Sequence, residues 1–288
     1  MEKTKTKKIA NDQFYTKKQV AEFCCEELLK IFSLKKEKIL EPSAGTGVFV
    51  DALKEKGIEN IEAYDIEPKH PDVKYSDFYQ LELKGNDYIT VGNPPFGKRS
   101  KIAIDFFNKC SEHSKIVAFI LPVQFKKYGV QSKLNKKFKL IKEILLKPDS
   151  FENNGKDLFV RCCFQIWARR EIGEEFDDLR IKEAPPTKHK DFEMYIYNNT
   201  KTALKFFDYD WDFAVFRQGF YDYSQRIFNK KDLNSKIQYL FFKAKDKTIL
   251  KRLLKMDYEK LSLKNTTIKG FGKADVVEEY KRLYENER

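Results

Sequence analysis

Apolar positions in the first 170 residues alternate between helical spacing and short continuous runs. Val20, Cys24, Leu28 and Ile31 recur at helical spacing. Short apolar runs bounded by turn residues predict buried strands. The predicted helices cover 16–32, 48–57 and 101–110, and the predicted strands cover 38–40, 61–66, 73–75, 87–92, 115–122, 140–146 and 158–168.

This alternation predicts an α/β fold of the Rossmann-like kind. Strands separated by helices form βαβ units, which build a mostly parallel sheet with helices on both faces. The seven strands would form one sheet within a catalytic domain spanning 11–170. The preceding residues 1–10 read as a basic tail.

The pattern changes after Glu171. Residues 171–192 are charged, contain Pro185-Pro186, and predict a linker. Residues 193–288 combine aromatic-rich stretches with two helical segments, one of them basic. We expect a small C-terminal α+β region that contributes to substrate recognition.

The net charge of +12 favours a polyanionic partner, most often nucleic acid. Lys greatly outnumbers Arg, a bias that an AT-rich genome also produces. No run approaches the roughly 18 apolar residues of a membrane span, and no leader pattern opens the chain. The expected location is the cytoplasm, with a nucleoid or a viral factory as alternatives.

Cysteine and histidine usage argues against metal chemistry. Five cysteines, none in a CxxC pair, and three histidines predict neither a zinc site nor a disulfide framework. We expect no metal and reduced, buried thiols.

A glycine turn follows the first predicted buried strand, in "KILEPSAGTGVFVDAL". Gly45 and Gly47 permit close backbone approach to a ligand, and Asp65 ends the next strand about 20 residues later. The third glycine of a dinucleotide fingerprint is missing. The turn therefore favours a nucleoside ligand without phosphates, and an ordinary βα turn is the alternative.

The stretch "VGNPPFGKRS" ends the fourth predicted strand with an amide, two prolines and an aromatic ring. Taken together, the glycine turn, the acid and Asn-Pro-Pro-Phe resemble the S-adenosylmethionine-dependent N6-adenine DNA methyltransferases. "NDQFYTKKQVAEF", "YSDFYQ" and "DSFENNGKDLFVRCCFQIW" are similar to further segments of that family. The resemblance covers about residues 11–170 and implies the class I methyltransferase form of the fold.

The resemblance implies a role for each matching residue. S-adenosylmethionine would be the cofactor, and nucleic acid, DNA rather than RNA, the substrate. A protein partner could supply sequence specificity, since the C-terminal region is short. The implied cofactor-binding residues are Thr16, Glu41, Ser43, Gly45, Gly47, Asp65, Ile66, Asp77, Phe78 and Asn93. The implied catalytic residues are Asn93, Pro94, Pro95 and Phe96, and the implied substrate-binding residues are Phe96, Phe151, Lys98 and Lys126, with Phe159 as an alternative to Phe151.

These residue types suit amine methylation. The exocyclic nitrogen of adenine is a poor nucleophile because its lone pair is delocalised into the ring. Two acceptors, the Asn93 side-chain oxygen and the Pro94 carbonyl, would hold the NH2 group and direct its lone pair. Phe96 would stack on a base flipped out of its helix.

Two lysine-rich segments could contact phosphates. Residues 125–147 carry eight lysines and one acid, and residues 243–264 carry eight Lys or Arg and three acids. Such contacts would be salt-sensitive and independent of sequence. Solvated helix faces are the alternative.

Other functions remain open at this point. Enzymes that methylate cytosine N4, guanine N2, RNA adenine (including the mRNA-cap adenosine) or a glutamine amide share the Asn-Pro-Pro-aromatic signature. A catalytically silent nucleic-acid-binding subunit and a small-molecule methyltransferase are further alternatives. The intact motif and both carboxylates disfavour a silent subunit.

Overall fold

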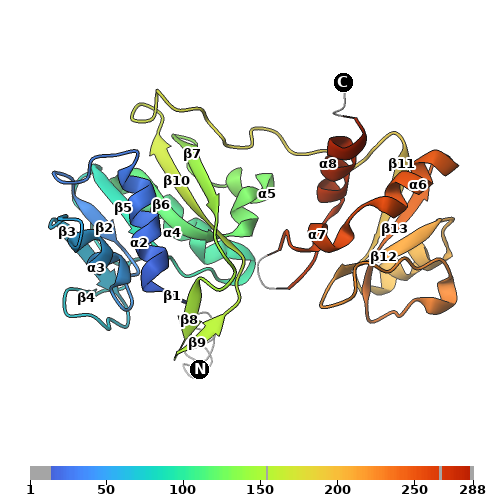
Figure 1. The fold of residues 1–288 in the computed structure, drawn as a ribbon, viewed down its shortest axis with the longest axis horizontal. Helices are drawn as coiled ribbons and strands as arrows, with labels where there is room; N and C mark the ends of the chain where they lie inside the picture. Colours follow the sequence, from blue (N-terminus) through green and yellow to red (C-terminus); the bar gives the residue numbers. More distant parts are fainter. Residues whose placement is uncertain (1–13, 154, 266–267, 286–288) are drawn as a thin grey trace. The chain divides into compact units, whose positions relative to one another are not determined.

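The computed structural model describes residues 14–153, 155–265 and 268–285, and divides the chain into two compact units at Lys182/Glu183 (Figure 1). The predicted basic tail, residues 1–10, lies outside the described residues.

A seven-stranded sheet forms the centre of the N-terminal unit, in the order β4-β3-β2-β5-β6-β10-β7. The pairs from β4 to β6 are parallel, and β10 is inserted antiparallel between β6 and β7. This doubly wound topology confirms the predicted class I methyltransferase fold. The strands are β2 (Ile39–Glu41), β3 (Ile61–Asp65), β4 (Lys74–Tyr75), β5 (Tyr88–Gly92), β6 (Ser114–Pro122), β7 (Phe138–Leu145) and β10 (Cys162–Arg169).

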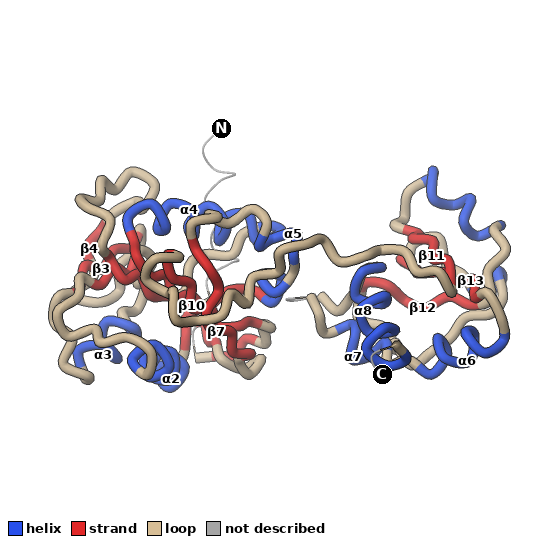
Figure 2. The backbone as a smooth tube through the Cα atoms, turned by 90° about the horizontal axis from the view of Figure 1, so that it is seen from above, coloured by secondary structure: helices blue, strands red, loops and turns tan. Residues whose placement is uncertain are grey.

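Helices cover both faces of this sheet, as expected (Figure 2). The helices are α2 (Lys18–Leu29), α3 (Val48–Lys54), α4 (Lys101–His113) and the short α5 (Tyr128–Gln131), with 3₁₀ turns η1 (Lys98–Ser100) and η2 (Val123–Lys126). Side chains of β6 alternate between the faces, as a strand buried on both sides requires. Ile116, Ala118 and Ile120 join the core beneath α2 and α3, while Val117, Phe119 and Leu121 join the core beneath α4.

A second small sheet, in the order β1-β8-β9, lies next to the chain's first described residues. It consists of β1 (Tyr15–Thr16), β8 (Phe151–Asn153) and β9 (Lys156–Leu158). Thr16 pairs with Phe151 in this sheet, so the expectation that a helix begins at Thr16 is wrong and α2 begins at Lys18. The pairing of β1 with the distant strand β8 sets the start of α2, and the local sequence pattern carries no information on that pairing.

The boundary between the two units falls inside the segment predicted as a linker. Arg180 donates to the carbonyls of Leu134, Asn135 and Phe138, and Arg170 pairs with Asp178. Residues 171–182 are therefore part of the N-terminal unit.

The C-terminal unit is a three-stranded antiparallel sheet, β11-β13-β12, with helices packed against it. Its aromatic residues form the core, and Phe241, Phe242 and Tyr258 are all buried. The predicted basic helix divides in two, because Asp257 caps a second short helix. The elements are β11 (Phe192–Tyr197), η3 (Lys201–Asp208), β12 (Phe213–Gln218), η4 (Lys230–Asp232), β13 (Gln238–Ala244), α6 (Lys247–Lys255), α7 (Tyr258–Ser262) and α8 (Lys273–Tyr284).

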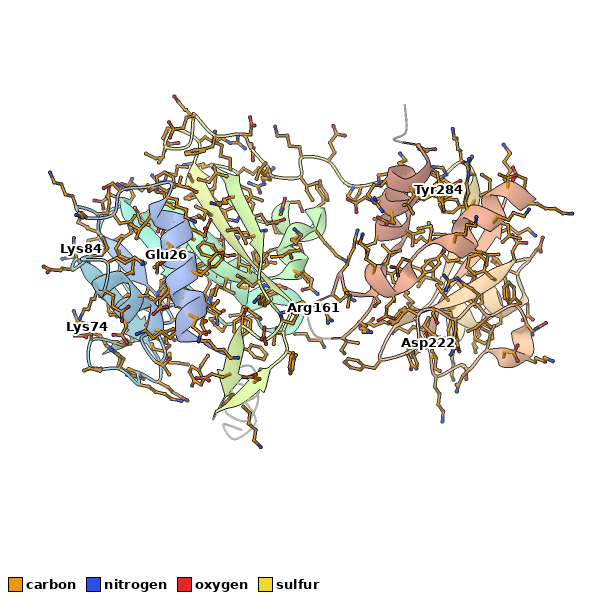
Figure 3. The ribbon with its side chains drawn as sticks, viewed as in Figure 1. Glu26, Lys74, Lys84, Arg161, Asp222 and Tyr284 are labelled. Carbon is orange, nitrogen blue, oxygen red and sulfur yellow. The ribbon has the colours of Figure 1, made fainter. Side chains whose placement is uncertain are left out.

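Charged side chains project from the surface of both units, including those of Lys74, Lys84 and Asp222 (Figure 3). Among the residues that the structure describes, no helix has the length and apolar character needed to cross a membrane.

Candidate functional site

The carboxyl ends of β2, β3 and β5 open into one cavity of about 670 Å³. This size is typical of small-molecule sites, and the carboxyl edge is where open α/β sheets bind ligands. Most of the residues expected to bind cofactor or substrate line it. They are Thr16, Glu41, Ser43, Gly45, Asp65, Ile66, Asp77, Phe78, Asn93, Pro94, Pro95 and Lys98. Gly47, Phe96, Phe151 and Lys126 are not among the lining residues.

The glycine turn between β2 and α3 adopts backbone conformations that favour glycine. Gly45 has φ of +50° and Gly47 has φ of +76°. A Cβ atom on Gly47 would lie 2.4 Å from Cγ of His70, and one on Gly45 would lie 3.3 Å from the Tyr15 ring. Gly47 therefore shapes the turn without lining the cavity, whereas Gly45 exposes its backbone there.

Asp65 ties this turn to the end of β3. Its Oδ2 accepts a hydrogen bond from the Gly45 amide at 2.7 Å, and its Oδ1 accepts one from the Glu67 amide at 2.8 Å. A carboxylate has about four acceptor sites, so each oxygen can still accept a bond from a ligand hydroxyl. The adjacent Ile66 is 45% exposed and offers an apolar surface to the same cavity.

Glu41, at the end of β2, is a buried carboxyl group in the cavity wall. Burial, together with the charges of Asp65 and Asp51, raises the pKa of Glu41 well above its usual range. Its Oε2 is buried and has no hydrogen-bond partner among the described residues. A carboxyl group without a hydrogen-bond partner is costly to bury. Buried ionisable groups with shifted pKa values are frequent at functional sites.

Asn93 follows β5 and is held from two directions. Its Nδ2 donates to the Phe14 carbonyl at 2.9 Å, and its own carbonyl accepts from the Ser43 hydroxyl at 3.3 Å. Its Oδ1 is buried and has no hydrogen-bond partner among the described residues. The residue after β5 thus carries a buried hydrogen-bond acceptor that has no partner among the described residues.

Asp77 and Phe78 form the far end of the cavity. Asp77 accepts from the Tyr79 amide at 2.9 Å through Oδ1 and from the Gln80 side chain at 3.2 Å through Oδ2. The Phe78 ring is buried against Phe106, with centroids 4.9 Å apart. Burial, with the charges of Asp105 and Asp77, raises the pKa of Tyr79 to about 12, so its hydroxyl stays protonated at neutral pH.

The two aromatic rings expected to meet the substrate base are closed off in this structure. Phe96 is 6% exposed and Phe151 is fully buried, and their centroids lie 6.5 Å apart in an edge contact. Phe14 packs against both, at 5.7 Å from Phe96 and 6.2 Å from Phe151. Phe96 therefore has no open stacking face in this structure, because the Phe14 ring packs against it, and its role toward a substrate base stays a prediction. Phe159, by contrast, is 72% exposed.

The two lysines expected at the substrate side differ. Lys98 is exposed and lines the cavity. Lys126 forms an ion pair with Glu143 and does not line it. Within the basic segment 125–147, Lys142 likewise pairs with Glu27. Part of the positive charge of this segment is thus neutralised within the protein.

Several lining residues were missed in the sequence. Phe14 and Tyr15 precede Thr16, and Lys69 donates to the Tyr15 hydroxyl at 2.6 Å beside the glycine turn. Lys101 and Ile102 begin α4 and face the cavity from the other side. In the sequence, the aromatic pair Phe14-Tyr15 beside Thr16 was a signal for this part of the cavity wall. Its position at the cavity depends on the pairing of β1 with β8.

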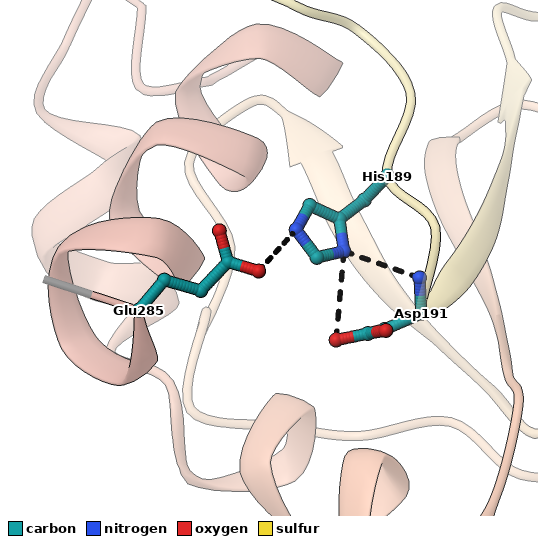
Figure 4. Close-up of side chains that lie close together, drawn as sticks. All are labelled: His189, Asp191 and Glu285. Atoms are coloured by element: carbon teal, nitrogen blue, oxygen red, sulfur yellow. Dashed lines mark hydrogen bonds and ion pairs between the residues drawn. The ribbon is translucent and has the colours of Figure 1, made fainter.

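One group of possible metal ligands occurs among the described residues: His189, Asp191 and Glu285, in the C-terminal unit. Asp191 and Glu285 approach opposite ring nitrogens of His189, at 3.8 Å from Nδ1 and 3.2 Å from Nε2 (Figure 4). Nδ1 also accepts from the Asp191 amide at 3.2 Å. Because one ion could bind only one ring nitrogen, this arrangement favours a hydrogen-bonded clamp over a metal centre.

Comparison with known proteins gives sequence relatives over part of the chain. Over 94 residues, the chain is 35% identical to the type II methyltransferases M.HincII and M.HindII of Haemophilus influenzae. The match covers 32% of this chain and 18% of each relative, so the chain spans less than a fifth of the relatives it matches. No family model matches.

Solved structures with related folds include methyltransferases of two kinds. A Pyrococcus horikoshii protein described as an RNA methyltransferase aligns over 55% of this chain and 87% of its own, with a TM-score of 0.46 and 16% identity. A type I restriction-modification methyltransferase subunit from Streptococcus thermophilus aligns over 54% of this chain and 45% of its own, with a TM-score of 0.42 and 14% identity.

The resemblance to methyltransferases that the motifs indicated is confirmed over the matched third of the chain. The N-terminal unit has the class I methyltransferase fold, and the chain is related in sequence to type II methyltransferases.

Proposed function

We propose that this chain transfers a methyl group from S-adenosylmethionine to the exocyclic N6 amine of adenine in DNA. The observation that carries the proposal is the buried Oδ1 of Asn93, which has no hydrogen-bond partner among those of residues 14–285 that the structure describes, at the wall of a cavity that also contains the glycine turn. One cavity thus combines groups suited to a nucleoside cofactor with an acceptor suited to an amine.

The cavity residues fit S-adenosylmethionine. Asp65 retains acceptor capacity for ribose hydroxyls, and Ile66 and Phe78 offer apolar surface for the adenine ring. The buried Glu41 carboxyl would favour a positively charged ligand, since a nearby cation stabilises its ionised form. Thr16, Ser43 and Gly45 line the same cavity.

The chain's own residues would orient and stabilise the amine. Bound S-adenosylmethionine supplies a methyl carbon on a sulfonium, which is already an activated leaving group. Asn93 Oδ1 and the Pro94 carbonyl would each accept a hydrogen bond from the NH2 group and direct the nitrogen lone pair at that carbon. Transfer of that carbon would leave S-adenosylhomocysteine and would place positive charge on the nitrogen. The two acceptors would stabilise this charge until the nitrogen releases one proton to water.

Nucleic acid is the proposed substrate class, on two grounds. The net charge is +12, and the relatives with similar sequence are type II methyltransferases. A role in restriction-modification follows from the same resemblance. We assign substrate recognition to the C-terminal unit, whose sheet and helices form a core of their own.

A transfer assay tests this function. The protein is incubated with tritiated S-adenosylmethionine and separate pools of duplex DNA, single-stranded DNA and RNA, and the labelled nucleoside is identified by mass spectrometry. N6-methyladenine in DNA is the expected product. Label found in RNA alone would show that RNA, and not DNA, is the substrate. N4-methylcytosine as the product would show that cytosine, and not adenine, is the target base.

A further inference from the structure

The amine-binding end of the cavity is closed in this structure. The Asn93 Oδ1 atom is buried and has no partner within the described part of the chain, and the Phe96 ring is 6% exposed. A base could neither reach that oxygen nor stack on that ring without displacing a group that covers them. The covering group must therefore be able to move if this end of the site is used.

Phe14 is a covering group. Its ring lies against Phe96, with centroids 5.7 Å apart and planes tilted by 32°, which is direct contact between aromatic rings. The same ring makes an edge contact with Phe151 at 6.2 Å. No further planar ring fits between Phe14 and Phe96 at that spacing.

Phe14 also acts through its main chain. Its carbonyl accepts from Nδ2 of Asn93 at 2.9 Å. A carbonyl can only accept, so this contact requires the NH2 side of the amide to face Phe14. The contact therefore leaves Oδ1 as the free acceptor at the site.

Phe14 is only partly buried, and it directly precedes the short strand β1. Its side chain is less buried than those of Phe96 and Phe151, so its ring is the one of the three that can move with the least exposure of the core. The residue can therefore hold Asn93 by its backbone while its side chain swings aside.

We propose that Phe14 is a gate residue: its carbonyl positions the Asn93 amide, and its ring occupies the place on Phe96 that a flipped base takes. This inference rests on the proposed function and adds the residue that controls entry to the base site. Base entry then exchanges one aromatic contact on Phe96 for another.

The test compares the wild-type protein with Phe14→Ala and with Phe32→Ala as a matched control. Phe32 is also partly buried and makes an edge contact with Phe176 at 6.0 Å, but it does not line the cavity. The probe is the 2-aminopurine deoxyriboside, a fluorescent adenine analogue, titrated in the presence of saturating S-adenosylhomocysteine. Binding of S-adenosylhomocysteine is measured first by calorimetry.

Phe14→Ala should bind the nucleoside about 3- to 10-fold more tightly than wild type, as expected when one aromatic contact no longer has to be broken. Phe32→Ala should bind like wild type. Weaker binding by Phe14→Ala would show that the ring is a wall of the base site, and equal binding would show that it is uninvolved. Either result overturns the gate.

The outcomes also separate this inference from the proposed function. If S-adenosylhomocysteine binds but no variant binds the nucleoside, the gate is wrong and the cofactor site stands. If S-adenosylhomocysteine does not bind to any of the three proteins, the proposed function fails, and the gate with it.

Discussion

At the scale of single residues, the site combines groups that are unfavourable for stability but useful for binding. Asn93 Oδ1 and Glu41 Oε2 are both buried without hydrogen-bond partners in the described part of the chain. Each such atom costs about 1–3 kcal/mol relative to a satisfied one. Free energy lost there in the unliganded protein can be recovered when a ligand supplies the missing partner.

Asn93→Ala should abolish most methyl transfer while leaving cofactor affinity nearly unchanged. The substitution removes one of two acceptors for the amine, and loss of one such group lowers kcat by about 10²–10³. Single-turnover rates and calorimetry with S-adenosylhomocysteine measure the two effects. Full activity in the variant would show that Asn93 is not the acceptor.

Glu41→Gln should stabilise the unliganded protein at neutral pH. Because burial raises the pKa of Glu41, the folded state holds a proton that the unfolded state releases. Wild-type stability therefore falls as pH rises above the ordinary glutamate range, and a glutamine does not ionise. Melting temperatures between pH 4 and pH 8 should diverge, with the variant higher at the upper end. Parallel curves would contradict the raised pKa.

At the scale of elements, the turn between β2 and α3 decides the geometry of the cofactor end. The Gly47 conformation and the packing of His70 are mutually dependent, because any Cβ on Gly47 would overlap the His70 ring. His70 is held in turn by Asp51 of α3, at 3.1 Å. The turn is therefore tied to the helix that follows it.

Gly47→Ala should destabilise the protein by about 1–3 kcal/mol and weaken cofactor binding. Positive φ strains an alanine, and the clash with His70 adds to that strain. The double variant Gly47→Ala/His70→Ala removes the overlap with the His70 ring, at 2.4 Å from Cγ, but keeps the φ strain and the contact with the Cβ of residue 70, at 2.7 Å. Denaturant unfolding should show partial recovery in the double variant. No recovery would mean that the clash with His70 is not part of the cost.

At the scale of the whole molecule, each of the two units has a core of its own. A ligand that binds one folded unit stabilises that unit by mass action. The proposed cofactor site lies entirely within the N-terminal unit. The two units should therefore respond separately to ligand and to mutation.

Calorimetric melting should show two transitions. S-adenosylhomocysteine should raise the midpoint temperature of only one of them, that of the N-terminal unit. His189→Ala should lower the midpoint temperature of the other transition, that of the C-terminal unit. The His189 side chain is 3% exposed, stacks on Phe192 with ring centroids 4.9 Å apart, and contacts Glu285. Phe32→Ala serves as the control in the N-terminal unit. A single transition that moves with both changes would show that the units unfold together.

Nucleic-acid affinity should fall steeply as salt rises, since phosphate contacts release counterions. Lys136 and Lys137 are adjacent and exposed in segment 125–147, and Lys136→Gln/Lys137→Gln should reduce the salt slope by about 2 if they contact phosphates. Lys142→Gln is the matched control, because Lys142 already pairs with Glu27. If the salt dependence of affinity equals that of the wild type, these two lysines do not contact the phosphates.

Periodicity sufficed for the strands of the large sheet, and motif order with the family resemblance named somewhat fewer than half of the residues that line the cavity. Strands of a parallel sheet present their carboxyl ends at one edge. The residues after β2, β3 and β5 therefore had to converge, whatever the details of packing. That is why Asp65 and Asn93 could be placed at one edge from the sequence, whereas Glu41 was named only through the resemblance to the methyltransferase family.

Only the tertiary structure decided what covers that edge. The antiparallel place of β10, the pairing of Thr16 with Phe151 and the contact of Phe14 with Phe96 join residues far apart in the chain. Local patterns carry no information on such contacts, because they depend on which distant segment offers the complementary surface. The sequence determined which residues gather at the carboxyl edge of the sheet, and long-range packing determined that the Phe96 ring and the Asn93 Oδ1 atom are covered there.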